Sequence, residues 1–250
     1  DIHIKEFKRL GVTGDFENYY STMSFTAEAQ IVRELGKFLI DGSLYQGFKP
    51  VFWSTVEKTA LADAEVEYEE HTSNTIFTAF KIKKTPKDFL KDSNIIIWTT
   101  TPWTIPANRA LAFNSGIEYS LVEINNLENF EEKKIIVATN LLDSVVKACG
   151  IKKFEILKTF NGAEFEGTIC THPFQSLGFN FDVPMLDARF VTLEQGTGIV
   201  HCAPSHGPDD FNLCLKHNIP SKYTVDNSGY YTNEIPFFSK THVFKADPIV

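Results

Sequence analysis

Hydrophobic residues recur at helical spacing in one stretch of the first 65 residues, SFTAEAQIVRELGKFLIDG. Ser24 precedes the first apolar residue as a helix N-cap would, and Gly42 follows the last one as a stop signal. The sequence therefore predicts an amphipathic helix here, followed by an extended stretch, KPVFWS, and a short alanine-rich helix, TALADAE. The apolar face of the predicted helix is formed by Phe25, Ile31, Leu35, Phe38 and Leu39.

From Val66 onward the pattern changes to short apolar runs separated by Asn, Gly, Pro and Asp, which is typical of β-strands joined by turns. Two helical patterns interrupt these runs, NLLDSVVKACG and GPDDFNLCLKHN. The strand-like runs are TIFTAFKI, NIIIWTT, EYSLVEI, KKIIVAT, KFEILKTF and RFVTL.

Together the two patterns predict an α+β fold in two parts. Residues 1–65 would form a helical and extended connecting segment. Residues 66–250 would form a mostly antiparallel β domain, closed into a barrel-like core with peripheral helices. The chain starts at Asp1 rather than at methionine, so we expect it to be a piece of a longer protein.

Composition narrows the possible functions. With 43% hydrophobic residues and 22 phenylalanines among 250, the chain can bury a large core, which argues against a disordered protein. A net charge of −8 argues against a dedicated nucleic-acid binder, although a domain could still meet the end of a nucleic acid locally. Four cysteines without a CxxC pair or zinc spacing predict reduced, mostly buried thiols. No apolar run reaches the roughly 18 residues of a membrane span.

The run WTTTPWTIPAN, residues 98–108, ends an apolar strand with several hydroxyl groups. Threonine fits a strand, so one interpretation is a polar strand end with a proline-directed turn. The other interpretation is a binding site, because two prolines fix φ and would hold the neighbouring hydroxyls in one geometry. Hydroxyls both donate and accept, which suits holding a water and a ribose against an ester. The candidate residues are Thr99, Thr100, Thr101 and Asn108.

The second candidate is GTGIVHCAPSHGPDDF, residues 196–211. Its glycines allow close approach of backbone to a ligand, but it lacks the third glycine of a dinucleotide fingerprint and the GK[ST] of a P-loop. His201 ends a short apolar strand, and Asp210 lies in the first turn of the next helix. Three interpretations stay open for this pair: a carboxylate that complements the helix dipole, a metal site, and an anionic partner for a substrate ammonium.

Together these peptides resemble the two signature peptides of the inserted editing domain in class I aminoacyl-tRNA synthetases for branched aliphatic amino acids. Their order and their separation of about 90 residues fit. TTTPWTIPAN and VHCAPSHG are similar to the isoleucyl-tRNA synthetase family, whereas leucine and valine members resemble TTRP, with methionine or lysine where His201 stands. FKRLGVTGDF, YSTM, YQGFKPVFWS and TALADAEVEY extend the resemblance to the N-terminal third, in a bacterial or organellar form. Neither HIGH nor KMSKS occurs, which implies an editing part without a synthetic site.

The resemblance implies an ester hydrolase that removes valine wrongly attached to tRNA(Ile), in a double-sieve mechanism, with valyl-adenylate as an open second substrate. Asp210 would bind the valine ammonium, while His201 and Trp103 would line the side-chain pocket and exclude isoleucine. The ribose, the ester and the attacking water would be held by Thr99, Thr100 and Thr101, with Asn108 supporting the turn.

The resemblance also implies no metal and no cofactor in this chain, because ATP and Mg²⁺ would serve the synthetic site that the sequence lacks. The expected partners are the acceptor end of tRNA(Ile) carrying valine and the rest of the parent synthetase. We expect no membrane contact, a monomer, and a cytoplasmic location, or the mitochondrial matrix for an organellar enzyme.

Three alternatives remain open. The chain could be a non-catalytic module that binds the tRNA acceptor end, or the editing domain of a valine- or leucine-type synthetase. It could also be an unrelated hydrolase built on Cys202 with His201 or His206. Adjacent side chains on a strand point to opposite faces, so Cys202 and His201 make a poor pair.

Overall fold

The computed structural model describes residues 2–125 and 133–250. The chain divides into two compact units, Asp1–Gly47 and Phe48–Val250. The boundary predicted near residue 65 divides the connecting segment from the β domain by their expected roles, and it stays a prediction. Among the described residues, no helix is both long and apolar enough to cross a membrane.

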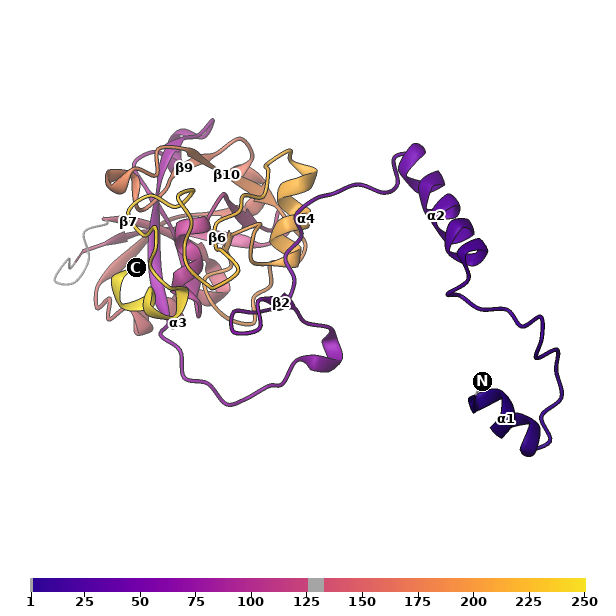
Figure 1. The fold of residues 1–250 in the computed structure, drawn as a ribbon. Helices are drawn as coiled ribbons and strands as arrows, with labels where there is room; N and C mark the ends of the chain where they lie inside the picture. Colours follow the sequence, from indigo (N-terminus) through magenta and orange to yellow (C-terminus); the bar gives the residue numbers. More distant parts are fainter. Residues whose placement is uncertain (1, 126–132) are drawn as a thin grey trace. The chain divides into compact units, whose positions relative to one another are not determined.

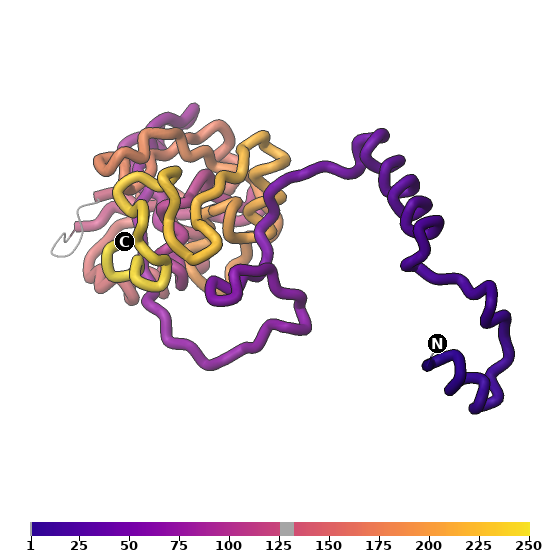
Figure 2. The backbone as a smooth tube through the Cα atoms, viewed as in Figure 1, coloured from indigo at the N-terminus to yellow at the C-terminus, as the bar shows by residue number. Residues whose placement is uncertain are grey.

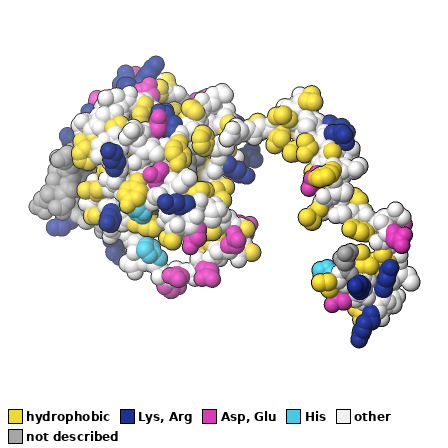
Figure 3. Space-filling model, viewed as in Figure 1, with side chains coloured by type: hydrophobic (Ala, Val, Ile, Leu, Met, Phe, Trp, Pro, Cys, Tyr) yellow, Lys and Arg dark blue, Asp and Glu magenta, His cyan; other side chains and the backbone are white. Residues whose placement is uncertain are grey.

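The first unit contains helices α1 (Ile2–Arg9) and α2 (Phe25–Ile40). The predicted helix after Ser24 is confirmed, and the serine hydroxyl accepts a hydrogen bond from the amide of Ala27 at 3.3 Å, as an N-cap does. Of the residues of α2, Ala27 alone is buried. The apolar face of this helix is therefore exposed, and Figure 3 shows hydrophobic side chains along it.

The second unit begins with a small antiparallel ribbon of β1 (Trp53–Ser54) and β2 (Thr59–Ala60). The predicted helix TALADAE is wrong, because its first two residues pair with β1 and its end forms a short 3-10 helix, η1 (Asp63–Glu65). Helix propensities of ordinary residues differ by about 0.7 kcal/mol or less, so strand pairing outweighs them here.

The rest of this unit is built on a nine-stranded sheet in the order β11-β5-β10-β9-β3-β4-β7-β6-β8. Figure 1 draws strands of this sheet as arrows, and Figure 2 traces the path of the backbone through the same unit. Neighbouring strands are antiparallel except for two parallel pairs, β10 with β5 and β4 with β7. The strands are β3 (Ile76–Lys84), β4 (Asn94–Thr99), β5 (Ala110–Phe113), β6 (Glu118–Ile124), β7 (Lys134–Ala138), β8 (Phe154–Asn161), β9 (Ile169–Thr171), β10 (Asp182–Asp187) and β11 (Val200–Cys202).

The prediction of an α+β fold with a large, mostly antiparallel sheet is confirmed, but the prediction of a closed, barrel-like core is wrong. Closing a sheet into a barrel requires main-chain pairing between its two end strands. In the described residues, β11 pairs with β5 alone and β8 pairs with β6 alone. The sheet therefore stays open.

Five of the six predicted strands and both later helices, α3 (Leu142–Ala148) and α4 (Pro208–Lys216), are confirmed. The sixth strand, RFVTL, is wrong, because residues 189–193 form turns and irregular backbone. Val191 is buried although it lies in a loop, and its carbonyl accepts a hydrogen bond from Asn114 Nδ2 at 3.1 Å. A buried loop residue of this kind imitates a strand pattern.

The sequence patterns do not predict α1, β5, β9 or β10, and of these β10 contains a proline. Proline cannot donate to a strand ladder, so it argues against a central strand. Pro184 lies where β10 changes partner: residues 182–184 pair with β9, and residues 185–187 pair with β5. The proline is tolerated because it falls at this change of partner.

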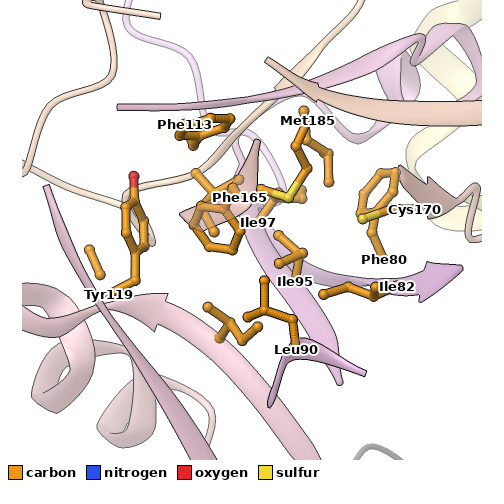
Figure 4. Packing of buried hydrophobic residues seen from close by; sticks show 14 of the residues in the cluster. Phe80, Ile82, Leu90, Ile95, Ile97, Phe113, Tyr119, Phe165, Cys170 and Met185 are labelled. Carbon is orange, nitrogen blue, oxygen red and sulfur yellow. The ribbon is translucent and has the colours of Figure 1, made fainter. Parts of the chain in front are cut away.

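Strand β4 is covered on both of its faces. Ile95 and Ile97 point into the main core, where they meet Phe80 and Phe165 (Figure 4). Ile96 belongs to a second cluster, which includes the buried residues of α3. The continuous apolar run NIIIW follows from this double burial.

Because both faces of β4 are covered, Ile96→Ala should destabilise the protein about as much as Ile95→Ala, by ~2–5 kcal/mol each in urea unfolding. Ile156→Ala is the control, since this side chain on β8 is 48% exposed. The control should cost less than about 1 kcal/mol. If Ile96→Ala proves as mild as the control, one face of β4 is not buried.

Candidate functional site

The two peptides singled out in the sequence line one cavity of about 400 Å³. Strand pairing brings them together, because β5 follows the threonine-rich turn and pairs with β11, with Leu111 opposite His201. Most of the predicted site residues lie in this cavity: Thr99, Thr100, Thr101, His201 and Asp210.

The threonine hydroxyls lie where β4 leaves the sheet. Thr99 is buried, and its Oγ1 accepts a hydrogen bond from the amide of Thr101 at 3.1 Å. The hydroxyls of Thr99 and Thr101 lie 3.4 Å apart, while Thr100 and Thr101 are exposed. The turn thus presents two accessible hydroxyls beside one that is fixed by the backbone.

The short 3-10 helix η3 (Pro102–Ala107) follows, and residues from it and from its C-cap contact both ring nitrogens of His201. Thr104 Oγ1 lies 2.9 Å from His201 Nε2, and Asn108 Nδ2 lies 3.4 Å from His201 Nδ1. Asn108 is fully buried and also donates to the carbonyl of Ala110 at 2.9 Å. The predicted supporting residue therefore touches His201 rather than the cavity.

These contacts define the state of the imidazole. The Thr104 hydroxyl donates its one hydrogen to the carbonyl of Thr101 at 2.9 Å, so it accepts from His201 Nε2–H. Nδ1 then accepts from the Asn108 amide. Burial, with smaller contributions from His206 and His172, lowers the pKa of His201 to about 4, so the ring is neutral at pH 7.

Asp210 contributes a carboxylate to the cavity from the first turn of α4. Its Oδ2 accepts a hydrogen bond from the amide of Ala203 at 2.8 Å. Burial raises the pKa of Asp210 to about 6, opposed by that hydrogen bond and assisted by Asp209. None of the described residues that line the cavity is Lys or Arg. Above pH 6 the cavity therefore holds a negative charge with no cationic side chain along its walls.

Two glycines are required by close approach around the cavity. Gly198 has φ +74°, and a Cβ there would lie 2.4 Å from Cβ of Ala138 at the end of β7. A Cβ on Gly207 would lie 2.9 Å from Oδ2 of Asp210. The carboxylate thus occupies the space that a side chain at position 207 would fill.

Trp103, also a predicted site residue, is not among the residues that line this cavity. It lines a neighbouring groove of about 500 Å³ together with aromatic residues such as Trp53 and Tyr223. His206 lies between the two spaces: it lines both and meets the edge of Trp103 at 4.8 Å between ring centroids. The role expected of Trp103 in the side-chain pocket stays a prediction.

Sequence reasoning missed Thr104 and His206 as cavity residues. Thr104 lies inside WTTTPWTIPAN, but nothing in the sequence distinguishes it from a threonine that is simply buried in the turn. His206 Nε2 lies 3.0 Å from the hydroxyl of Thr224, a residue outside both peptides. These pairings depend on tertiary contacts.

Cys202 points away from the cavity. It is fully buried in a cluster with Ala110, Leu213 and Cys214, whereas His201 beside it lines the cavity. Burial raises the pKa of the Cys202 thiol well above its usual range, with Asp210 and Cys214 adding to the shift. This arrangement argues against a Cys202–His201 nucleophilic pair. Among the described residues, no group of three His, Cys, Asp or Glu could hold a metal ion.

Comparison with known proteins places this geometry in context. Residues 1–240 match the family of tRNA synthetases class I (I, L, M and V). The chain is similar to isoleucine–tRNA ligase of Pelagibacter ubique (strain HTCC1062), with 64% identity over 250 residues, 100% of this chain and 28% of that protein. The ligase of Gluconobacter oxydans (strain 621H) is 48% identical over 252 residues, 98% of this chain and 26% of that protein. The chain thus spans about a quarter of the length of these relatives.

Among solved structures, the chain is similar to the crystal structure of GlLeuRS-CP1, with a TM-score of 0.48, 14% identity, and 63% of this chain and 78% of that chain covered. It is also similar to the editing domain of the P. knowlesi cytosolic leucyl-tRNA synthetase, with a TM-score of 0.44, 16% identity, and coverage of 58% and 65%.

Buried neutral histidines make stability depend on pH. Burial lowers the pKa values of His172, His201 and His206 to about 4, below the usual 6.5. Their stabilisation is present above pH 6.5 and is lost as pH falls through 4. Asp210, with its raised pKa, acts in the opposite direction, because its contribution is present below pH 3.8 and is lost as pH rises through 6. Between pH 6 and pH 4, where all four groups change their charge, the three histidines outweigh Asp210.

We therefore expect the free energy of unfolding to fall between pH 6.5 and 4, measured by urea unfolding across that range. His206→Gln should reduce the pH slope by roughly one proton, because the unfolded state no longer takes up that proton. His71→Gln is the matched control, since His71 is exposed. An unchanged slope in His206→Gln would mean that His206 titrates alike in the folded and unfolded states.

Proposed function

The chain belongs to the class I tRNA synthetases, and from this premise we propose that its cavity is an editing site. The proposed reaction is hydrolysis of the ester that joins valine to the end of tRNA(Ile), with valyl-adenylate as a second substrate. The curated relatives at 64% and 48% identity are isoleucine–tRNA ligases, which supports the isoleucine branch over the valine and leucine branches.

The observation that carries this proposal is the carboxylate of Asp210 in a cavity without Lys or Arg along its described walls. Its raised pKa reflects a charge that burial leaves poorly stabilised. A substrate ammonium would supply the missing positive charge through a charge-assisted hydrogen bond. An aminoacyl ester carries such an ammonium two bonds from its carbonyl carbon, so this contact would also fix the position of the ester.

The hydroxyls at the end of β4 suit the other end of the substrate. Thr100 and Thr101 are exposed in the cavity, and each can donate to an ester or ribose oxygen while accepting from a water. In the proposed step, the oxygen of that water bonds to the ester carbonyl carbon. The bond to the ribose oxygen then breaks, the ribose oxygen takes up one proton of the water, and valine leaves as its carboxylate while the second proton is released to solvent.

His201 serves as a wall in this proposal. Both of its ring nitrogens are engaged, by Thr104 and Asn108, and the ring is neutral, so it is poorly placed to take a proton from water. The rate would come from orientation of the water and the ester, which can supply several kcal/mol.

Selectivity would come from size. One methylene in an apolar pocket is worth roughly 1–3 kcal/mol, and isoleucyl-tRNA synthetases are the usual example of this limit. That difference is too small for accurate charging without a second site. An imidazole held by two hydrogen bonds cannot move aside easily, so it would admit valine and clash with the extra methylene of isoleucine.

The proposal extends to the partners and surroundings of the chain. The acceptor end of tRNA(Ile) and the rest of the ligase would be its partners. ATP and Mg²⁺ would belong to the synthetic site elsewhere in the ligase. We propose a monomer in the bacterial cytoplasm, or in the mitochondrial matrix for an organellar enzyme.

Asp210→Asn should lower hydrolysis of Val-tRNA(Ile) by roughly 10- to 100-fold, the loss expected when one hydrogen bond to a charged group disappears. Asp209→Asn is the matched control, because Asp209 is exposed and does not line the cavity. Release of labelled valine from tRNA is measured on this chain, beside the Pelagibacter ubique ligase. Binding of tRNA with no valine release by the unsubstituted chain would favour the non-catalytic module. Full activity in Asp210→Asn would refute the proposed contact between Asp210 and the substrate ammonium.

His201→Ala should allow the chain to hydrolyse correctly charged Ile-tRNA(Ile), because the wall that excludes the extra methylene is shortened. The expected gain in the Ile-to-Val rate ratio is roughly tenfold or more, the factor that about one methylene commands. His217→Ala, at the exposed end of α4, should leave the ratio unchanged. Continued refusal of Ile-tRNA(Ile) by His201→Ala would place the sieve elsewhere.

A further inference from the structure

The backbone of Trp103, in the threonine-rich turn, is held on both sides of its Cα by two side chains from the last 20 residues of the chain. The amide of Trp103 donates to Oδ1 of Asp247 at 3.1 Å. The carbonyl of Trp103 accepts a hydrogen bond from the hydroxyl of Tyr231. The two partners lie 144 and 128 residues away in sequence, so these contacts are tertiary.

Two features of η3 explain why the Trp103 amide and carbonyl need partners outside the helix: the position of Trp103 at the helix start and the proline at position 106. The first amides of any helix lack a partner within it, and Thr101 gives η3 no side-chain cap. The amide of Trp103 is therefore free to bind Asp247. In a 3-10 helix the carbonyl of residue 103 would accept from the amide of residue 106. Position 106 is Pro106, which has no N–H, so the Trp103 carbonyl is also left for a side chain.

Tyr231 is itself held in place. Tyr231 is 2% exposed and packs in a cluster with Ala107, Phe238 and Ala246. Its own backbone is bonded on both sides, from its amide to the carbonyl of Thr241 at 3.0 Å and from the amide of Lys240 to its carbonyl at 2.9 Å. The Trp103 carbonyl is thus tied to a packed part of the protein.

The next residue is Thr104, whose hydroxyl lies within hydrogen-bond distance of His201 Nε2. A shift of the Trp103 backbone would move Thr104 and break the contact that holds the His201 ring. We propose that Tyr231 and Asp247 are positioning residues that set the size selectivity of the cavity through Thr104 and His201. This inference rests on the proposed editing function for its activity readout, but its structural readout does not.

The test uses Asp247→Ala and Tyr231→Phe, which remove the two contacts. Each should lower the ratio of Val-tRNA(Ile) to Ile-tRNA(Ile) hydrolysis by roughly tenfold, as the loss of one hydrogen bond allows. Asp247→Asn keeps an acceptor oxygen and should restore the ratio. Tyr230→Phe is the control for the second contact, because Tyr230 is adjacent and 43% exposed. A purely structural role would lower both rates together and leave the ratio unchanged, which would overturn the inference.

Imidazole ¹⁵N chemical shifts of His201 give a second readout that needs no activity. They should move toward a mixture of tautomers in Asp247→Ala and Tyr231→Phe and stay put in Asp247→Asn and Tyr230→Phe. If the unsubstituted chain hydrolyses no ester, the proposed function fails. The ¹⁵N shifts alone then decide whether the contacts to the Trp103 backbone position His201. Unchanged shifts in both contact-removing variants would overturn the inference.

Discussion

Burial of β4 on both faces is the constraint on which the site depends. Ile95, Ile96 and Ile97 are covered by two separate clusters, so the middle of this strand carries apolar side chains alone. The first hydroxyl after the run, on Thr99, is still buried, and the next two are exposed in the cavity. The accessible hydroxyls therefore begin where the burial of β4 on both faces ends.

The two cavity peptides are joined by hydrogen bonds through a neutral ring. A neutral imidazole offers one donor and one acceptor, and Thr104 and Asn108 match them one to one. This pairing leaves Asp210 as the main charge in the cavity. A cavity with hydroxyls along one segment and one unpaired carboxylate on the other favours a ligand that is cationic at one end and polar at the other.

The sequence predicted most elements because their signals are local. The Ser24 cap, the periodicity of α2 and five strand runs are all readable within about ten residues, and the resemblance of two peptides to class I synthetases is confirmed. The failures involve contacts over long distances. Thr59 and Ala60 pair as a strand within an alanine-rich run, RFVTL is a loop that buries Val191, and the sheet stays open. Thr104 could not be ranked above its neighbours, because its partner lies 97 residues away.

The placement of the tryptophans has an optical consequence. The chain has three, and all of them border the two hollows: Trp98 lines the cavity, while Trp53 and Trp103 line the groove. Indole emission depends on the polarity around the ring, and this protein has no tryptophan in a remote core to mask such changes. Its tryptophan fluorescence, excited where tyrosine does not absorb, therefore reports on these two spaces, so that a ligand entering either of them can be followed without an attached dye.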